Sequence, residues 1–299
     1  MSVLQTLLSG SIDYAGLFPP AGLGMAEAVA NYASYRIGPH AWALGRFVVP
    51  AARLVELEQV LGGHLPRFST SDRWRLAVLV GSDPLRDLEA IGEFNCAHVA
   101  DGAGMAVVDV VEGKADSADA VERLLSHVPS DLQPYVEIPV SRDPRPLAAA
   151  IARMGGRLKV RTGGITPDAF PAAADLVRFL CAARDAGVPF KATAGLHHPL
   201  RAEYQLTYEP DSACGTMFGF LNLFLAAAFV GAGLDDAAAE RLLEEGDRTA
   251  FRFDAGGIEW RGQRLDLDRI RRARESAIIS FGSCSFTEPI DDLHSLGLL

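Results

Sequence analysis

The sequence predicts an α/β fold, a (β/α)8 TIM barrel, and three observations lead to this prediction. Short apolar segments that suit β-strands alternate with amphipathic segments rich in alanine and leucine, and eight such strands can be assigned in 299 residues. Proline or aspartate often opens the helical segments, as is usual at helix N-termini. No linker, low-complexity stretch or charge block divides the chain. We therefore expect residues 1–299 to form one barrel domain.

Each element follows from its apolar pattern and its flanking turn residues. The expected strands are Ile12–Phe18, Leu44–Val49, Arg75–Val80, Met105–Val110, Pro134–Pro139, Leu158–Arg161, Pro189–Thr193 and Ala277–Phe281. The helices expected between them are Met25–Tyr35, Ala51–Leu61, Pro84–Glu93, Ser117–Ser126, Pro144–Met154 and Pro171–Ala186. A doubly wound sheet would suit six or seven such units nearly as well. However, no Gly-x-Gly-x-x-Gly follows the first strand, which weakens its dinucleotide-binding version.

The connection between the seventh and eighth strands is much longer than the others, and we expect an insertion at about residues 205–265. We expect it to contain helices and a hairpin, because Asp-Ala-Gly-Gly is typical of a tight turn. The expected elements of this region are the helices Leu221–Val230 and Asp235–Glu245, the hairpin Phe251–Arg261 and the helix Leu267–Arg274. The insertion should lie near the barrel mouth or at a contact between subunits of a homo-oligomer, and the sequence leaves both open.

Composition and charge exclude several classes of partner. The formal net charge is −10, which argues against a nucleic-acid partner and against binding to an anionic membrane surface. The four cysteines show no zinc-binding spacing, and the N-terminal segment does not resemble a signal peptide. The most apolar run, Met217–Val230, is too short to span a membrane. We expect a cytoplasmic protein with free thiols, in which Cys284 packs rather than reacts.

Two similar segments, each a short strand that runs into a glycine turn, carry the lysines Lys159 and Lys191. The two positions are separated by 191 − 159 = 32 residues, which is about one strand–helix–strand unit of roughly 30 residues. In a parallel barrel, this spacing brings both amines to adjacent strands at the same rim. Burying two amines is costly, so the pair indicates amine chemistry.

A lysine becomes nucleophilic when desolvation or a neighbouring cation lowers its pKa. Lys191 and Arg161 are cations that could act on Lys159 in this way, and the amine could then form a Schiff base with a carbonyl compound. An acid must shuttle protons during that step, and the candidates are Asp109 and Glu137. A structural ion pair between Lys159 and one of these carboxylates explains the same residues equally well.

Further polar and small residues fall at the expected C-terminal ends of strands, where barrel enzymes bind substrates. Backbone amides in the glycine and serine loops would suit an anion. These candidate substrate-binding residues are Asp13, Arg46, Glu137, Arg161, Gly163, Thr193, Gly195, His197, Gly282, Ser283 and Ser285. Asp13 could instead stabilise the first turn, and Arg46 could lie at the surface. The glycine and serine loops could be ordinary turns without a binding role.

The series of strand motifs resembles the deoxyribose-phosphate aldolase family, class I Schiff-base aldolases built on a (β/α)8 barrel. The matching segments, in the same order over nearly the whole chain, are Ile12–Ala21, Val48–Pro50, Val108–Val111, Val136–Glu137, Lys159–Gly163, Phe190–Leu196 and Phe281–Ser285. The resemblance implies that Lys159 forms the Schiff base, that Lys191 perturbs it and that Asp109 relays protons. It also implies that the loop after the eighth strand holds a substrate phosphate, and that no cofactor is needed.

This chain departs from the family pattern at several places. Arg161 stands where the family has a serine, and the segment after Gly195 continues into His197-His198. The insertion before the eighth strand is also absent from ordinary members. Because an arginine can bind a carboxylate through two hydrogen bonds, we expect a small anionic carbonyl substrate with a carboxylate in place of, or beside, a phosphate.

Two other functions remain open from the sequence. The first is a divalent-metal-dependent barrel lyase or isomerase that uses Asp109, Glu137 and a histidine. Adjacent histidines cannot easily point at one metal ion, so we expect no metal at His197-His198, with one ring at the mouth and the other capping a helix. The second is a barrel that binds a small ligand without catalysis, which a mouth plugged by the insertion would favour.

Overall fold

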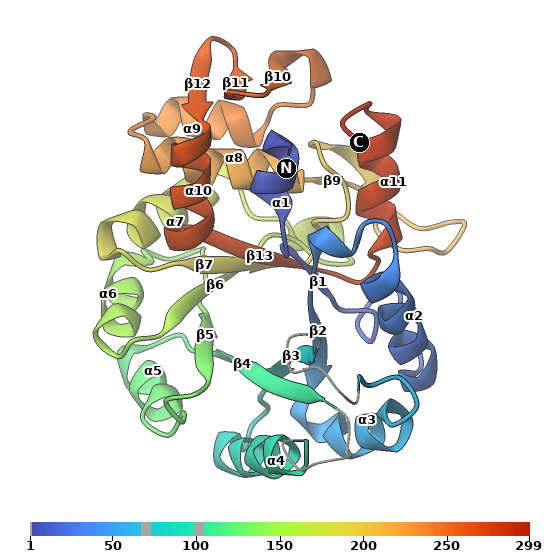
Figure 1. The fold of residues 1–299 in the computed structure, drawn as a ribbon. Coiled ribbons are helices and arrows are strands. Elements are labelled where there is room, and N and C mark those ends of the chain that lie inside the picture. Colours follow the sequence, from blue (N-terminus) through green and yellow to red (C-terminus); the bar gives the residue numbers. More distant parts are fainter. Residues whose placement is uncertain (1, 67–72, 99–104) are drawn as a thin grey trace.

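Eight parallel strands close into a barrel in the computed structural model, which describes residues 2–66, 73–98 and 105–299 (Figure 1). The strands pair in the order β1-β13-β7-β6-β5-β4-β3-β2. They are β1 (Ile12–Tyr14), β2 (Leu44–Pro50), β3 (Trp74–Leu79), β4 (Ala106–Lys114), β5 (Gln133–Glu137), β6 (Arg157–Arg161), β7 (Phe190–Thr193) and β13 (Ile278–Ser283). The (β/α)8 barrel predicted from the sequence is thereby confirmed.

Helices form a ring outside the strands (Figure 1). Those between the first seven strands are α2 (Met25–Ile37), α3 (Leu54–Leu61), α4 (Pro84–Ala97), α5 (Ala118–Leu125), α6 (Arg145–Arg153) and α7 (Ala173–Ala186). Asp83 caps α4 and Ser117 caps α5, because each side chain accepts a hydrogen bond from a backbone amide of the first turn. Two helices that the sequence did not predict, α1 (Val3–Leu8) and α11 (Thr287–Ser295), add to the ring.

Successive side chains of the strands face alternately the surrounding helices and the lumen of the barrel. On β6 and β7, Leu158, Val160, Phe190 and Ala192 are buried in the main core between strands and helices. The residues between them, the two lysines among them, therefore face the lumen, as the sequence predicted.

A small apolar cluster, separate from the main core, fills part of the lumen. It consists of Val48, Ala77, Val110 and Tyr135, one from each of four neighbouring strands. The ring centroid of Tyr135 lies 5.7 Å from the amine of Lys191. The cluster therefore borders the polar groups of the lumen on one side and excludes water from them there.

Strand β4 continues beyond its predicted end at Val110 as far as Lys114. Its pairing with β3 is irregular: Leu76 pairs with Val108, whereas the next residue of β3 pairs with Val110. Asp109 is therefore an extra residue in β4, as in a β-bulge. As a consequence, the C-terminal end of this strand is not where the sequence pattern placed it.

The long connection between β7 and β13 contains the predicted insertion, with two additions. Its elements are the hairpin β8 (Ala202–Gln205) and β9 (Cys214–Met217), the helices α8 (Phe220–Gly231) and α9 (Asp236–Leu243), the sheet β10 (Phe251–Asp254), β11 (Gly257–Trp260) and β12 (Gln263–Asp266), and α10 (Leu267–Ser276). The predicted hairpin at residues 251–261 is confirmed as β10–β11. The β8–β9 hairpin and the third strand, β12, were not predicted.

Different parts of the insertion pack at different places in the fold. Helix α8 joins the ring of helices, where Phe220 and Phe224 pack on Phe281 of β13 with centroid distances of 4.9 and 5.8 Å. The three-stranded sheet lies outside α8, α9 and α10, away from the barrel (Figure 1). The β8–β9 hairpin instead reaches the barrel mouth, described below. In the described parts of the chain, no helix combines the length and apolar character needed to cross a membrane.

Candidate active site

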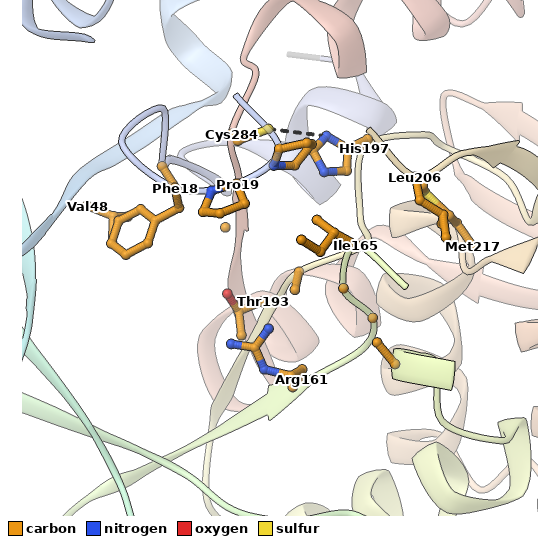
Figure 2. A pocket seen from close by; sticks show the side chains of 18 of the residues that line it. Phe18, Pro19, Val48, Arg161, Ile165, Thr193, His197, Leu206, Met217 and Cys284 are labelled. Atoms are coloured by element: carbon orange, nitrogen blue, oxygen red, sulfur yellow. Dashed lines mark hydrogen bonds between the residues drawn. The ribbon is translucent and has the colours of Figure 1, made fainter. Parts of the chain in front are cut away.

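A cavity of about 380 Å³ opens at the C-terminal ends of the barrel strands (Figure 2). Its walls come from the loops after β1, β6, β7 and β13 and from the β8–β9 hairpin, which contributes Leu206 and Met217. The predicted site residues that line it are Lys159, Arg161, Gly163, Lys191, Thr193, Gly195, His197 and Gly282. The hairpin therefore forms a wall of the cavity and leaves the lysines accessible from it.

The sequence contains only three lysines among its 28 lysine and arginine residues, and all three lie at this end of the barrel. They alternate with three carboxylates in a continuous series of ion pairs, which we call the charge row. The charge row consists of Lys114, Glu137, Lys159, Glu112, Lys191 and Asp13 in that order. Three positive charges are thus balanced by three negative ones within the row.

Lys159 lies near the middle of the charge row and at the inner wall of the cavity. Its amine is 2.8 Å from the carboxylate of Glu112 and 3.1 Å from that of Glu137. The contact to Glu137 is an ion pair without hydrogen-bond alignment, because that oxygen has no hydrogen-bond partner among the described residues. The side chain is 4% exposed, which leaves its amine in contact with the cavity and otherwise shielded from water.

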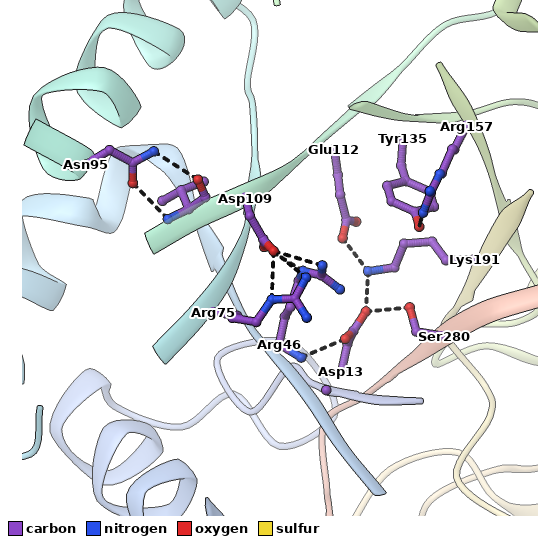
Figure 3. A network of polar contacts seen from close by, with 12 residues as sticks. Asp13, Arg46, Arg75, Asn95, Asp109, Glu112, Tyr135, Arg157, Lys191 and Ser280 are labelled. Atoms are coloured by element: carbon purple, nitrogen blue, oxygen red, sulfur yellow. Dashed lines mark hydrogen bonds and ion pairs between the residues drawn. The ribbon is translucent and has the colours of Figure 1, made fainter. Parts of the chain in front are cut away.

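Lys191 is held more tightly than Lys159. Its amine donates hydrogen bonds of 2.6 Å to Asp13 and 2.5 Å to Glu112 (Figure 3). Burial alone would lower the pKa of Lys191, but the two carboxylates outweigh burial and raise it above its usual value. Asp13 also accepts a hydrogen bond from Ser280 and one from the backbone amide of Arg46, so it is fixed in place. Asp13 therefore anchors Lys191 and does not line the cavity.

Glu112 joins the two lysines and is ionised. Burial alone would raise the pKa of this carboxyl group, but Lys159 and Lys191 lower it from 4.5 to about 2. Burial alone would also raise the pKa of Glu137. The positive charges of Lys159, Arg161 and Lys114 hold that pKa below its usual value. Both carboxylates are therefore charged at neutral pH, and each lies within reach of the Lys159 amine.

The expected location of Asp109 beside Lys159 is wrong. Its carboxylate accepts hydrogen bonds from Arg46 at 2.6 and 3.0 Å and from Arg75 at 2.7 Å (Figure 3). These arginines overcome the effect of burial and lower the pKa of Asp109. The physical reason is the irregular β3–β4 pairing, which leaves Asp109 three positions before Glu112 in the strand. Arg46 is engaged in the same pair and does not line the cavity, in contrast to its predicted substrate-binding role.

Arg161 lies at the boundary between the main cavity and a neighbouring cavity of about 560 Å³. Its guanidinium is 3.3 Å from Glu137, and its side chain is 47% exposed. Lys114 and Arg142 also line the second cavity, together with Glu137. Asp116, Asp168 and Asp175 line the second cavity too, so its charges are mixed, and Arg161 is the cation that it shares with the main cavity.

The glycines Gly163 and Gly195 bring two loops into close contact at the cavity wall. A methyl group added at Gly163 would lie 2.4 Å from the ring of Phe170, and one added at Gly195 would lie 3.0 Å from the α-carbon of Gly163. Gly195 also has a φ of +69°, which favours glycine. Thr162 ties the loops by donating a hydrogen bond of 2.6 Å to the carbonyl of Ala194. The glycines are thus needed to pack the loops.

The loop after β13 contributes less to the cavity than predicted. Gly282 lines it, but Ser283 and Ser285 do not. The hydroxyl of Ser283 accepts a hydrogen bond from the backbone amide of Ser285, and the hydroxyl of Ser285 accepts one from the amide of Glu288. Both serine side chains therefore stabilise the turn into α11.

The adjacent histidines make their shortest contacts with different carboxylates; one ring lies at the mouth, as expected, but the other does not cap a helix. His197 lines the cavity and lies 3.0 Å from Glu288 of α11. His198 lies 2.6 Å from Asp292 of the same helix and stacks on Tyr204 at a centroid distance of 3.5 Å. Among the residues with described positions, no group of three or more histidine, cysteine, aspartate or glutamate residues could hold a metal ion.

The key residue that the sequence reasoning missed is Glu112. Strand β4 was expected to end at Val110, so Glu112 was not considered as a strand residue. Two signals could have identified it. Glu112 is two residues after Val110, so it lies on the same face of a continued strand. The chain also has so few lysines that a carboxylate expected near them is conspicuous. Comparison with protein-family models, with curated proteins and with solved structures gave no match to this chain.

Proposed function

We propose that this protein is a Schiff-base lyase that makes or breaks a carbon–carbon bond in a small anionic carbonyl compound, with Lys159 as the nucleophile. The observation that carries the proposal is the position of all three lysines in the charge row at the barrel mouth. Elsewhere the chain uses arginine for its positive charges, and a guanidinium stays protonated in proteins. Only an amine can add to a carbonyl and form an imine.

Lys159 is a better candidate nucleophile than Lys191. Both amines line the cavity, but the carboxylates lie 2.5 and 2.6 Å from Lys191, against 2.8 and 3.1 Å from Lys159. The closer pairs hold Lys191 more firmly as a cation. Lys191 also shares Glu112 with Lys159, so this carboxylate divides its contacts between the two amines. The proposal therefore keeps the two predicted roles, in which Lys159 attacks the carbonyl and Lys191 modifies the reactivity of Lys159.

The reaction requires that the Lys159 ammonium first loses a proton, and Glu112 and Glu137 are the groups within reach. The free amine then adds to the carbonyl carbon: a C–N bond forms, and the carbonyl π pair moves to the oxygen. That oxygen takes up protons and leaves as water, which produces an iminium. When the bond between the α and β carbons breaks, its electron pair flows into the iminium and forms an enamine, while the hydroxyl group on the β carbon loses its proton and becomes the carbonyl of the second product. Protonation and hydrolysis release the product and restore the amine.

The charge row favours the iminium as well as the resting ammonium. Both species carry one positive charge at the same position, between Glu112 and Glu137. Carboxylates that are already fixed and desolvated stabilise such a cation without having to reorganise. Glu112 replaces Asp109 in this proposal as the group that relays protons, because Asp109 is held by Arg46 and Arg75.

The substrate's anionic group would lie beside Arg161. Arg161 lines both cavities, and its side chain is 47% exposed. A carboxylate or a phosphate can accept two hydrogen bonds from an arginine. The resemblance to deoxyribose-phosphate aldolases, which rests on the strand motifs, supports the same amine chemistry, whereas Arg161 in place of a serine favours a different substrate.

The proposal is tested by borohydride reduction in the presence of small keto acids and of sugar phosphates, followed by mass mapping. Because the sequence offers only three lysine side chains, the modified residue can be assigned without ambiguity. We expect an adduct on Lys159 that is lost in Lys159→Met. The matched control is Lys114→Met, since Lys114 is 69% exposed and pairs with the same Glu137; this variant should keep the adduct. An adduct confined to Lys114 or Lys191, or none with any compound on folded protein, would contradict the proposal.

A further inference from the structure

A cysteine and a histidine that the lysine chemistry does not use meet at the wall of the same cavity. Cys284 follows β13 and His197 follows β7, so the barrel brings together residues that are 87 positions apart in the chain. The sulfur of Cys284 lies 3.9 Å from Nδ1 of His197, and both residues line the cavity (Figure 2). Cys284, which was expected to pack rather than react, therefore has a histidine next to its sulfur.

Glu288 completes this arrangement by orienting the histidine. Its carboxylate lies 3.0 Å from Nδ1 of His197, the same nitrogen that faces the thiol. Burial alone would lower the pKa of His197, but the interactions with Cys284 and Glu288 raise it to about 9. The imidazole therefore carries a positive charge at neutral pH. A protonated imidazole next to the thiol is an acid placed to protonate an oxygen that forms beside the sulfur.

The other titratable groups around the pair keep their protons or are neutralised by partners. Tyr208, from the turn of the β8–β9 hairpin, lies 3.6 Å from the Cys284 sulfur and donates a hydrogen bond to Glu288; burial and these neighbours raise its pKa. Burial also raises the pKa of Tyr14 of β1 to about 12, with a contribution from Cys284. His198 lies 3.9 Å from Glu288 and is paired with Asp292. Neither tyrosine hydroxyl is ionised at neutral pH.

We propose that Cys284, His197 and Glu288 form a second reactive centre, in which the sulfur of Cys284 adds reversibly to a small aldehyde in the cavity. As the Sγ–C bond forms, the carbonyl π pair moves to the oxygen, which takes a proton from His197, and the imidazole takes up the proton that leaves the thiol. The product is a hemithioacetal, and the reverse step restores the thiol, the imidazolium and the aldehyde. No oxidant or reductant is needed.

The aldehyde class follows from the surroundings of the thiol. A carbonyl carbon is a suitable electrophile because the neighbouring imidazolium can protonate the alkoxide as it forms. The cavity of about 380 Å³ fits a small molecule, and Arg161 in its wall would hold an anionic one. The centre uses no lysine, so it does not depend on the proposed lyase reaction.

The first experiment compares cysteine alkylation by iodoacetamide at pH 7, with mass mapping of each site. Cys214 is the internal control, because it is exposed whereas Cys284 is buried. We expect Cys284 to react at least tenfold faster than Cys214 despite its burial, and we expect this excess to disappear in His197→Gln. If Cys284 reacts no faster than Cys214 in the folded wild-type protein, the proposal fails.

The second experiment detects the sulfur–carbon bond directly. Glycolaldehyde labelled with ¹³C at the carbonyl carbon is added to the protein, and the hemithioacetal carbon is followed by NMR. We expect the signal in the wild type and in Lys159→Met and its loss in Cys284→Ser, a substitution of similar size. A signal that persists in Cys284→Ser, or no signal in the wild type, would overturn the proposal. Failure of lysine trapping alone would leave this result intact, because the two bonds form on different residues.

Discussion

Replacing Glu112 by glutamine should lower the free energy of unfolding by several kcal/mol at neutral pH, because Glu112 bridges two buried ammonium groups. Its carboxylate lies 2.8 Å from Lys159 and 2.5 Å from Lys191, and the side chain is 2% exposed. The lysines lower its pKa from 4.5 to about 2, and a shift of that size corresponds to about 3 kcal/mol of stability. Breaking a buried ion pair generally costs about 3–5 kcal/mol, which sets the order of magnitude of the expected loss.

The pH dependence of this loss has a definite sign. The pKa of Glu112 is lower in the folded protein than its usual value of 4.5, so its stabilising contribution is fully present above pH 4.5. It is lost as the pH falls from 4.5 toward 2, where the folded carboxylate is protonated too. The difference in stability between the wild type and Glu112→Gln should therefore be constant near neutral pH and shrink on acidification.

Urea unfolding followed by circular dichroism at several pH values measures this difference. Glu58→Gln is the matched control, because Glu58 is an exposed residue of α3 and a surface change of this kind is usually worth less than about 0.5 kcal/mol. A loss below about 1 kcal/mol for Glu112→Gln at pH 7 would show that the bridge contributes far less than a buried pair should. A difference that stays constant down to pH 3 would refute the assignment of the charged form.

Three further substitutions test the site and its loops. Asp109→Asn should leave borohydride trapping on Lys159 unchanged. It should lower the free energy of unfolding in urea by about 1–3 kcal/mol, because the side chain loses ion pairs with two arginines outside the cavity. A tenfold loss of trapping would indicate that Asp109 takes part in the reaction. Arg161→Ala should weaken binding of short keto acids and sugar phosphates about tenfold by calorimetry, or about 1.4 kcal/mol, and leave neutral aldehydes unaffected; equal affinities before and after the change would exclude an anion clamp. Gly195→Ala should lower the free energy of unfolding by about 1–3 kcal/mol, which is more than Gly187→Ala should. Both glycines have a positive φ, but only a methyl group at position 195 would meet neighbouring atoms. Similar shifts of the melting temperature for both variants would contradict the packing role.

The barrel itself could be predicted because burial on two sides gives each strand a recognisable apolar run. All eight predicted strand segments correspond to barrel strands, and the inward direction of the lysines followed from the period of two along β6 and β7. The ends of elements were less predictable, because a polar residue inside the lumen looks like the end of a strand. This is the reason that β4 was expected to stop at Val110, although it continues to Lys114.

The choice of Asp109 over Glu112 shows the limit of a pattern-based assignment. Both are acidic residues on one strand, and a regular strand would put them on opposite faces. The irregular pairing between β3 and β4 decides which level of the barrel each one reaches, and it depends on contacts with a neighbouring strand. Such a bulge leaves no clear local signal in the sequence, whereas the scarcity of lysine is a global signal that composition does provide.

The barrel prediction places the residues after the seventh and eighth strands at the same rim, but it does not give the directions of their side chains. The contact between Cys284 and His197 depends on those directions, which are set by the turns after β13 and β7.

The charge row and the pair of Cys284 and His197 give two sides of the same cavity different charges. The amine of Lys159 lies between two carboxylates, 2.8 Å from Glu112 and 3.1 Å from Glu137, so its addition to a carbonyl must disturb both ion pairs. Cys284 instead has the cationic ring of His197 beside its sulfur. An aldehyde that entered this cavity would therefore meet two nucleophiles with opposite surroundings, an amine between anions and a thiol beside a cation. Because the carbon of a hemithioacetal is no longer a carbonyl carbon, capture at sulfur would compete with attack by Lys159, which lines the same cavity.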